Sequence, residues 1–105
     1  MKTNQSVINS LAVREYERAI AELSEYDYSV KRLRSCSAEV ITTKNYYILR
    51  SYNTLVACIN RYTGAEADVL RKVYGYTATS AQHIRKFFND YKVSFSYPVN
   101  SYQYR

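Results

Sequence analysis

Apolar residues in the first third of the chain recur at alternating intervals of four and three, which places them on one side of a helix. The pattern predicts that residues 1–35 are helical, with Ser6 as the cap of the first turn. Ser24 and Asp27 have the spacing of a second capping box, so the segment forms either one helix or a helix pair. The stripe consists of Ala12, Tyr16, Ala19, Leu23, Tyr26, Val30 and Leu33.

Two roles are open for this stripe. It either covers a sheet formed by the following residues or makes the seam of a homo-oligomer. Ala12, Ala19 and the two tyrosines make a weak coiled-coil seam compared with isoleucine and leucine. The sequence therefore favours packing on a sheet and leaves a homo-oligomer through the amino-terminal helix as the alternative.

After Ser35, β-branched and aromatic residues replace the helix formers, and residues 38–76 are predicted to form an antiparallel sheet. Lys44-Asn45, Ser51 to Asn53 and Thr63-Gly64 are the turn signals. They divide the segment into strands over residues 39–43, 46–50, 54–62 and 69–76.

The alternation within the second and third of these strands assigns their side chains to two faces. We expect the core face to carry Tyr47, Leu49, Leu55, Ala57 and Ile59. The opposite face then carries Tyr46, Ile48, Arg50, Thr54, Val56 and Cys58.

Residues 79–92 have the pattern of a second amphipathic helix. Thr79 and Gln82 have capping-box spacing, and Ile84, Phe87, Phe88 and Tyr91 form its apolar stripe. Residues 93–105 are expected to be an edge strand over 93–99, which Pro98 confines to an edge, followed by a loose tail from Asn100. The predicted fold is α+β: an amino-terminal helix or helix pair, an antiparallel sheet of three or four strands, and a carboxy-terminal helix packed on one face.

A length of 105 residues predicts a single domain over residues 1–105. The net charge is +6 and is unevenly placed. Residues 1–30 hold three Lys or Arg against five Asp or Glu, and residues 31–105 hold twelve against four. A basic body behind an acidic helix indicates an anionic partner, although a solvated basic surface explains the same charges.

Few residues are typical of catalysis. His83 is the single histidine and lies beside the apolar stripe of the last helix, where a packing or capping role suffices. Cys58 falls inside a strand, and Cys36 and Cys58 are too few for a zinc site or a disulfide framework. The sequence predicts no enzyme, no metal and no cofactor. Without an apolar stretch of membrane length, we expect a cytoplasmic protein that makes no membrane contact.

Tyrosine is unusually frequent, with thirteen residues, and tryptophan is absent. Several tyrosines neighbour Lys or Arg, as in proteins that stack bases on aromatic rings and hold phosphates with cations. Tyrosine and arginine are also enriched at protein interfaces, so both kinds of partner remain open. The predicted contact residues are Arg50, Tyr52, Arg61, Tyr62, Arg71, Lys72, Tyr74, Arg85, Lys86, Tyr102 and Tyr104.

Two segments carry a resemblance. The run from Leu49 to Ala57 resembles an L-x-S-Y-x-T-x-V-A pattern, and the run from Tyr76 to Phe87 resembles Y-S-x-T-T-x-x-H-I-x-x-F. Together they look like a group of small uncharacterised proteins from phages and mobile elements. Both motifs also suit a hairpin corner and a docked helix, so a wholly structural role is open.

The resemblance implies a phage or mobile-element setting. Small phage proteins without catalytic groups commonly act by binding, and many block host defence, as anti-CRISPR proteins do. The leading hypothesis is an inhibitor of a host-defence nucleoprotein, such as a CRISPR effector, that sterically blocks a nucleic-acid-binding surface. The alternative is a small basic DNA- or RNA-binding protein, either a regulator or a single-strand binder.

Overall fold

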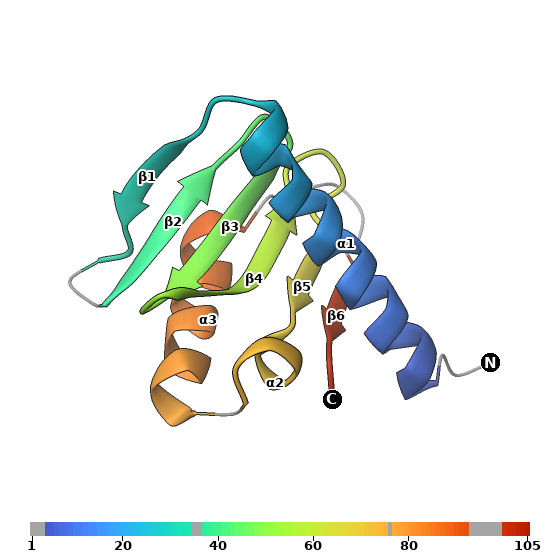
Figure 1. The fold of residues 1–105 in the computed structure, drawn as a ribbon. Coiled ribbons are helices and arrows are strands. Elements are labelled where there is room, and N and C mark those ends of the chain that lie inside the picture. Colours follow the sequence, from blue (N-terminus) through green and yellow to red (C-terminus); the bar gives the residue numbers. More distant parts are fainter. Residues whose placement is uncertain (1–3, 35–36, 76, 93–99) are drawn as a thin grey trace.

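The protein folds as one six-stranded sheet with helices on both faces (Figure 1), so the predicted α+β class is confirmed, but the sheet has more strands than the three or four predicted. The computed structural model describes residues 4–34, 37–75, 77–92 and 100–105. The strands follow the order β1-β2-β3-β4-β5-β6, and all neighbours are antiparallel except β5 and β6. The elements are α1 (Gln5–Glu25), β1 (Ser29–Arg32), β2 (Ala38–Thr42), β3 (Tyr46–Ser51), β4 (Thr54–Asn60), β5 (Glu66–Asp68), α2 (Leu70–Val73), α3 (Ala78–Tyr91) and β6 (Ser101–Gln103).

The predicted amino-terminal helix is confirmed as a single helix, α1, but the helix pair and the helical span over residues 1–35 were wrong, because β1 follows α1. Asn4, rather than Ser6, caps α1, because its side chain accepts a hydrogen bond from the Val7 N–H at 3.0 Å. The helix ends at Glu25, and the chain then becomes extended. Ala12 and Ala19 are completely buried against the sheet, which confirms the sheet-covering role for the part of the stripe that lies within α1.

Glu22 fixes the last turn of α1 to the β2–β3 turn. Its buried carboxylate accepts hydrogen bonds from the Thr43 hydroxyl at 2.6 Å, the Asn45 N–H at 2.9 Å and the Asn45 side-chain amide. Burial alone would raise the pKa of Glu22, but these hydrogen bonds lower it below its ordinary value. The carboxylate therefore stays charged and orients the helix across the sheet.

A β-bulge changes the predicted faces of the β3–β4 hairpin. Leu49 lies opposite Ala57, but the next pair along β3 is Arg50 and Leu55, so Val56 is an extra residue. Val56 consequently packs on the α3 side with Ala57, and Leu55 turns to the α1 side, opposite to the prediction.

Both faces of the sheet are core faces, whereas the sequence predicted one. On the α3 side, Tyr47, Leu49 and Ile59 lie in one apolar cluster as expected. On the α1 side, Ile48 and Cys58 are completely buried in a second cluster. The two clusters explain why apolar residues from both faces follow one another in the central parts of β3 and β4.

The strand predicted over residues 69–76 does not exist in its described part. Strand β5 precedes that segment, and the Asp68 carboxylate accepts a hydrogen bond from the Leu70 N–H at 3.0 Å, which starts the short helix α2. Val69 and Leu70 are buried, as their apolar character suggests, but they lie at the start of a short helix and not in a strand. Gly75, with φ of +90°, follows that helix.

Helix α3 packs on one face of the sheet, as predicted, but begins slightly earlier. Thr77 is its cap, with a side chain that accepts a hydrogen bond from the Ser80 N–H at 3.1 Å, so Thr79 lies inside the helix. Ile84 and Phe87 are buried. Phe88 and Tyr91 are half-buried and complete the predicted stripe.

The carboxy-terminal residues form a strand rather than the predicted loose tail. Strand β6 runs parallel to β5, and α1 packs beside it (Figure 1). Asn9 binds both backbone groups of Arg105, donating to the carbonyl at 2.9 Å and accepting from the N–H at 3.0 Å. The strand predicted over residues 93–99, together with Cys36 and Tyr76, lies outside the described residues. Among the described residues, no helix has the length and apolar character needed to cross a membrane.

Candidate functional site

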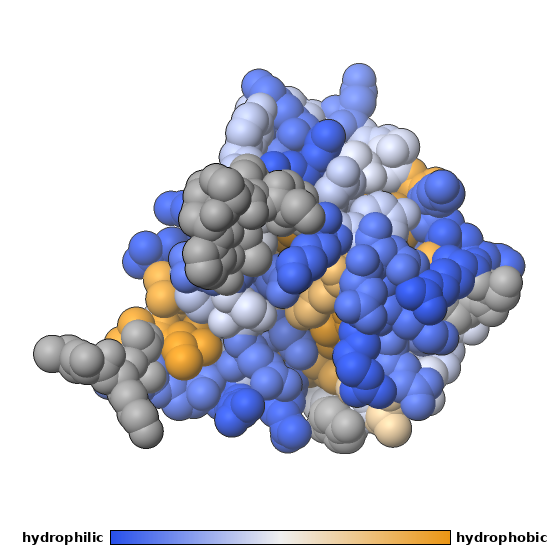
Figure 2. Space-filling view, turned by 180° about the vertical axis from the view of Figure 1, so that it is seen from behind, coloured by the Kyte–Doolittle hydropathy of each residue, from blue (hydrophilic) through white to orange (hydrophobic). Residues whose placement is uncertain are grey.

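The eleven predicted contact residues do not form one surface. The hairpin between β3 and β4 carries Arg50 and Tyr52, and the end of β4 carries Arg61 and Tyr62. Helix α3 carries Arg85 and Lys86, and Figure 2 shows the outward side of this helix as hydrophilic. The structure brings only one part of the set together, where α2 meets the carboxy-terminal residues. That part is Lys72 with Tyr104, beside which Tyr102 packs in the same cluster, whereas Arg71 and Tyr74 are neighbours of Lys72 in the sequence.

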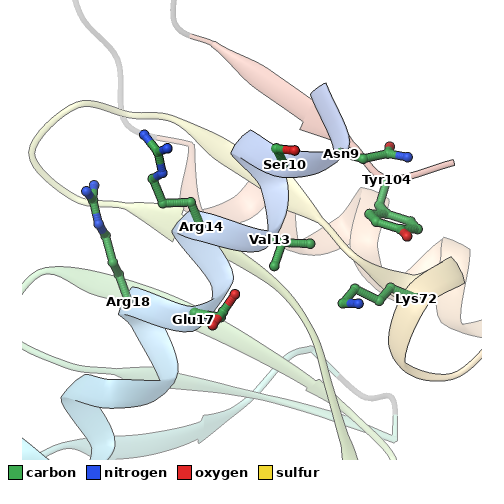
Figure 3. Close-up of a pocket in the computed structure, with 8 residues that line it drawn as sticks. All are labelled: Asn9, Ser10, Val13, Arg14, Glu17, Arg18, Lys72 and Tyr104. Carbon is green, nitrogen blue, oxygen red and sulfur yellow. The ribbon is translucent and has the colours of Figure 1, made fainter. Parts of the chain in front are cut away.

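An open groove of about 560 Å³ lies between α1, α2 and the carboxy-terminal residues (Figure 3). Arg14 and Arg18 line it from α1, where Figure 3 shows their guanidinium groups pointing away from the side on which Lys72 and Tyr104 line it. The Lys72 Nζ atom lies 5.7 Å from the centre of the Tyr104 ring, within the range of a cation–π contact. We call these four residues the basic corner.

The cations of the basic corner are not neutralised by ion pairs. None of Arg14, Arg18 and Lys72 lies within ion-pair distance of a carboxylate among the described residues. Glu17 is the one carboxylate among the groove-lining residues, against three cations. The residues that line the groove therefore carry an excess of positive charge, and Lys72 is the cation that lies beside the Tyr104 ring.

The sequence prediction missed Arg14 and Arg18 because they lie in the stretch with net negative charge. Their spacing of four residues was the available signal, since it places both guanidinium groups on the same side of a helix. The burial of Ala12 and Ala19 against the sheet determines which side of α1 faces Lys72. The acidic helix thus contributes two cations to the predicted basic surface.

Two of the predicted arginines have structural partners instead. Arg50 forms an ion pair with Glu39 on the neighbouring strand. Arg61 donates hydrogen bonds to the Thr43 carbonyl at 2.7 Å and the Lys44 carbonyl at 3.2 Å. The Arg61 contacts hold the β2–β3 turn, and the Arg50 ion pair links β3 to β2, so both guanidinium groups are less available to a partner.

The tyrosines of the predicted set differ in exposure. Tyr62 is 67% exposed, and Tyr52 and Tyr74 are about half exposed. Tyr102 and Tyr104 are half-buried and pack against the cluster under α1. The first three present their rings to solvent, whereas the last two combine packing with an exposed edge.

The two motifs of the resemblance meet at a buried polar cluster. The Ser51 hydroxyl lies 2.8 Å from His83 Nδ1 and 2.9 Å from the Ser80 hydroxyl. Burial lowers the pKa of His83, and nearby Lys86 adds to this, so the neutral imidazole is favoured. Ser51 is only 1% exposed, so its hydroxyl is enclosed by protein, and its hydrogen bonds link the β3–β4 hairpin to α3.

Tyr52 covers this cluster from the hairpin tip. Its ring centre lies 5.7 Å from that of His83, and its N–H donates a hydrogen bond to the Ser37 carbonyl at 3.0 Å. The residue has φ of 56°, a left-handed conformation that costs about 1–2 kcal/mol outside glycine. The contacts to His83 and Ser37 offset this strain and hold the ring in one place.

Chemistry based on Cys58 or a metal finds no support in the described parts of the chain. Burial, followed by the negative charge of Glu15, raises the pKa of the Cys58 thiol, so the thiolate is disfavoured. Across residues 4–34, 37–75, 77–92 and 100–105, no group of three or more His, Cys, Asp or Glu side chains could hold a metal ion.

Comparison with known proteins gave no match to a protein-family model, to a curated protein or to a solved structure. The functional argument therefore depends on the surfaces of this chain.

Proposed function

We propose that this protein acts by binding and that the basic corner is its main contact surface for a nucleic-acid-containing partner. In its most specific form, the partner is a host-defence nucleoprotein such as a CRISPR effector. The protein, from a phage or mobile element, would occupy the nucleic-acid-binding surface of that effector in the host cytoplasm. This mechanism is steric and uses no catalysis and no cofactor.

The observation that carries the proposal is one groove lined by an aromatic ring and by three cations that have no ion-pair partner within the described part of the chain. Phosphate groups bind Lys and Arg, and exposed bases stack on aromatic rings. Arg14 and Arg18 add guanidinium groups, which match phosphate geometry through paired hydrogen bonds. The carboxylate of Glu17 would repel an anion, but three cations line the same groove.

Direct binding of free DNA or RNA is the second candidate, and the exposed ring of Tyr74 next to α2 favours it. A single strand could cross the groove and place a base on this ring. The two candidates share a contact surface and differ in whether free nucleic acid suffices for binding.

The test compares two double variants with the same change in charge. Lys72→Glu with Arg18→Glu alters the basic corner, and Arg85→Glu with Lys86→Glu alters the outward side of α3. Fluorescence anisotropy with labelled single-stranded RNA, guide-loaded effector and free effector measures binding at several salt concentrations. Plasmid interference in CRISPR-active cells measures inhibition.

We expect the basic-corner variant to lose binding and inhibition, and the α3 variant to keep most of both. The affinity of the wild type should fall with salt, with a slope reduced by about 1 for each lost phosphate contact. Binding to free RNA without inhibition supports the second candidate. Equal losses in both variants would show that the basic corner is not the site, and a wild type inactive in every assay would overturn the proposal.

A further inference from the structure

Strand β1 forms an edge of the sheet that neither α1 nor α3 covers (Figure 1), and all four of its residues are exposed. Its backbone is oriented by the pairing with β2. The Leu33 N–H donates to the Ala38 carbonyl at 2.9 Å, in the same register that pairs Lys31 with Val40. In an antiparallel ladder such pairs alternate, so the N–H and C=O groups of Val30 and Arg32 point away from β2, toward the free edge.

Apolar side chains gather on the same segment. Tyr26, Tyr28 and Val30 are three of the seven large apolar side chains that are exposed among the described residues. Tyr26 is the C-cap of α1, Tyr28 directly precedes β1, and Val30 lies within the strand. Since single exposed apolar residues are ordinary but clusters indicate contact surfaces, this clustering marks the edge as a candidate interface.

The edge is also positively charged. Neither Lys31 nor Arg32 lies within ion-pair distance of a carboxylate among the described residues. Glu39 stands opposite Arg32 in the register, but its carboxylate is paired with Arg50. An incoming strand with acidic side chains would therefore meet two cations that are not neutralised.

We propose that the β1 edge binds an extended acidic segment of a partner protein by strand addition. The outward backbone groups of Val30 and Arg32 supply the ladder, the apolar side chains supply contact area, and the two cations select acidic residues. A second copy of this chain fits poorly, because pairing two β1 strands brings their Lys31 and Arg32 side chains together.

This surface is separate from the basic corner. Strand order places β1 at one edge of the sheet, whereas Tyr104 follows β6 at the other edge. The inference therefore does not depend on the proposed function, and variants can disrupt each surface alone.

The experiment uses two short labelled peptides, one alternating Val with Glu and one alternating Val with Lys. Anisotropy measures their binding to the wild-type protein, to Lys31→Glu with Arg32→Glu, and to Val30→Pro. Proline removes the outward N–H of Val30 and leaves the β1–β2 ladder intact, because an edge strand tolerates proline there. Lys72→Glu with Arg18→Glu is the matched charge control.

We expect the wild type and the basic-corner control to bind the Glu peptide and not the Lys peptide. The β1 charge variant should weaken Glu-peptide binding by about tenfold or more and gain affinity for the Lys peptide. In the wild type, the Glu peptide should slow hydrogen exchange at the amides of Val30 and Arg32, as pairing requires.

Three outcomes would overturn the inference. One is an absence of binding between the wild type and the Glu peptide at low salt. Another is unchanged binding in both β1 variants, which would place the peptide elsewhere. The third is a wild-type dimer in light scattering that Val30→Pro dissociates, which would make a second copy the occupant of this edge.

Discussion

The two edges of the sheet differ in how they are protected from pairing with other chains. At the β6 edge, α1 packs beside the strand, and the Gln5 side chain donates a hydrogen bond to the Gln103 carbonyl at 2.9 Å. At the β1 edge, no helix covers the strand, and every residue is exposed. Unpaired strand edges invite other chains, so proteins normally cover them or charge them. This chain covers one edge and charges the other.

The sequences of the two edge strands fit this difference. Strand β6 has no charged residue over Ser101–Gln103, and an uncharged exposed edge would pair readily with other chains. Strand β1 carries Lys31 and Arg32, which oppose pairing with a second copy. The covered edge depends on long-range packing, whereas the open edge depends on local charge, so the two should respond differently to substitution.

The largest expected effect comes from disrupting the covered edge through Ala12→Asp. Ala12 is completely buried between α1 and the sheet, and an uncompensated charge there costs about 3–5 kcal/mol in the free energy of unfolding. Val7→Asp on the same helix is the control, because Val7 is exposed and such changes stay within about 0.5 kcal/mol. Urea unfolding followed by circular dichroism measures both. Similar losses in the two variants would contradict the packing of α1.

Next in size is Glu22→Ala, which removes the acceptor at the other end of α1. Three donors from Thr43 and Asn45 lose their partner, so we expect the free energy of unfolding to fall by about 2–3 kcal/mol. Glu25→Ala, at an exposed position on the same helix, should change it little. Urea unfolding again measures the difference, and an unaffected Glu22 variant would show that the carboxylate does not hold the turn.

Ser51→Ala should cost about 1–2 kcal/mol, because it removes the bonds to His83 and Ser80 in a buried cluster. The exposed Ser24→Ala is its control.

The same cluster predicts a pH dependence. The pKa of His83 is lowered from its ordinary 6.5, so the unfolded chain binds a proton more readily than the folded one. Stability should therefore fall as the pH drops below 6.5.

Unfolding experiments at several pH values in the wild type and in His83→Gln check this dependence. His83→Gln should abolish the decrease in the free energy of unfolding that occurs just below neutral pH. The decrease at lower pH should remain, because Glu22 and Asp90, whose pKa values are lowered, take up protons there. An identical pH profile in both proteins would contradict the assignment to His83.

The smallest effect is expected at the open edge. Val30→Thr should leave the free energy of unfolding within about 0.5 kcal/mol, because Val30 is 44% exposed. Val40→Thr makes the same change on the neighbouring strand, where Val40 is 1% exposed, and should cost about 1–3 kcal/mol for the buried hydroxyl. Comparable losses would mean that β1 is packed more tightly than its exposure indicates.

The sequence predicted the elements whose patterns were long enough to be distinctive. Strands β2, β3 and β4 and helix α3 lie close to their predicted positions, and α1 lies within the predicted helical segment but ends earlier. Strand β1 was missed because Val30 and Leu33 extended the helical spacing by chance, although one is exposed and the other buried. Strands β5 and β6, with three residues each, are too short to show alternation.

Long-range packing explains the remaining differences. The bulge at Val56 turned Leu55 to the other face, and nothing local in the alternation signals an extra residue. The candidate site depends on packing in the same way. Lys72 and Tyr104 were predicted contact residues, but their meeting with Arg14 and Arg18 required the position of α1 on the sheet.

The strand order also has a kinetic consequence. Strands β1 to β5 are neighbours in the chain as well as in the sheet, so their pairing closes only short loops. The contact between Gln5 and Gln103 joins residues 98 positions apart and must overcome a larger loss of chain entropy. We therefore expect the hairpins to form early in folding and the β6 edge to close late. Variants at Gln5 or Asn9 should then speed unfolding and leave the folding rate nearly unchanged.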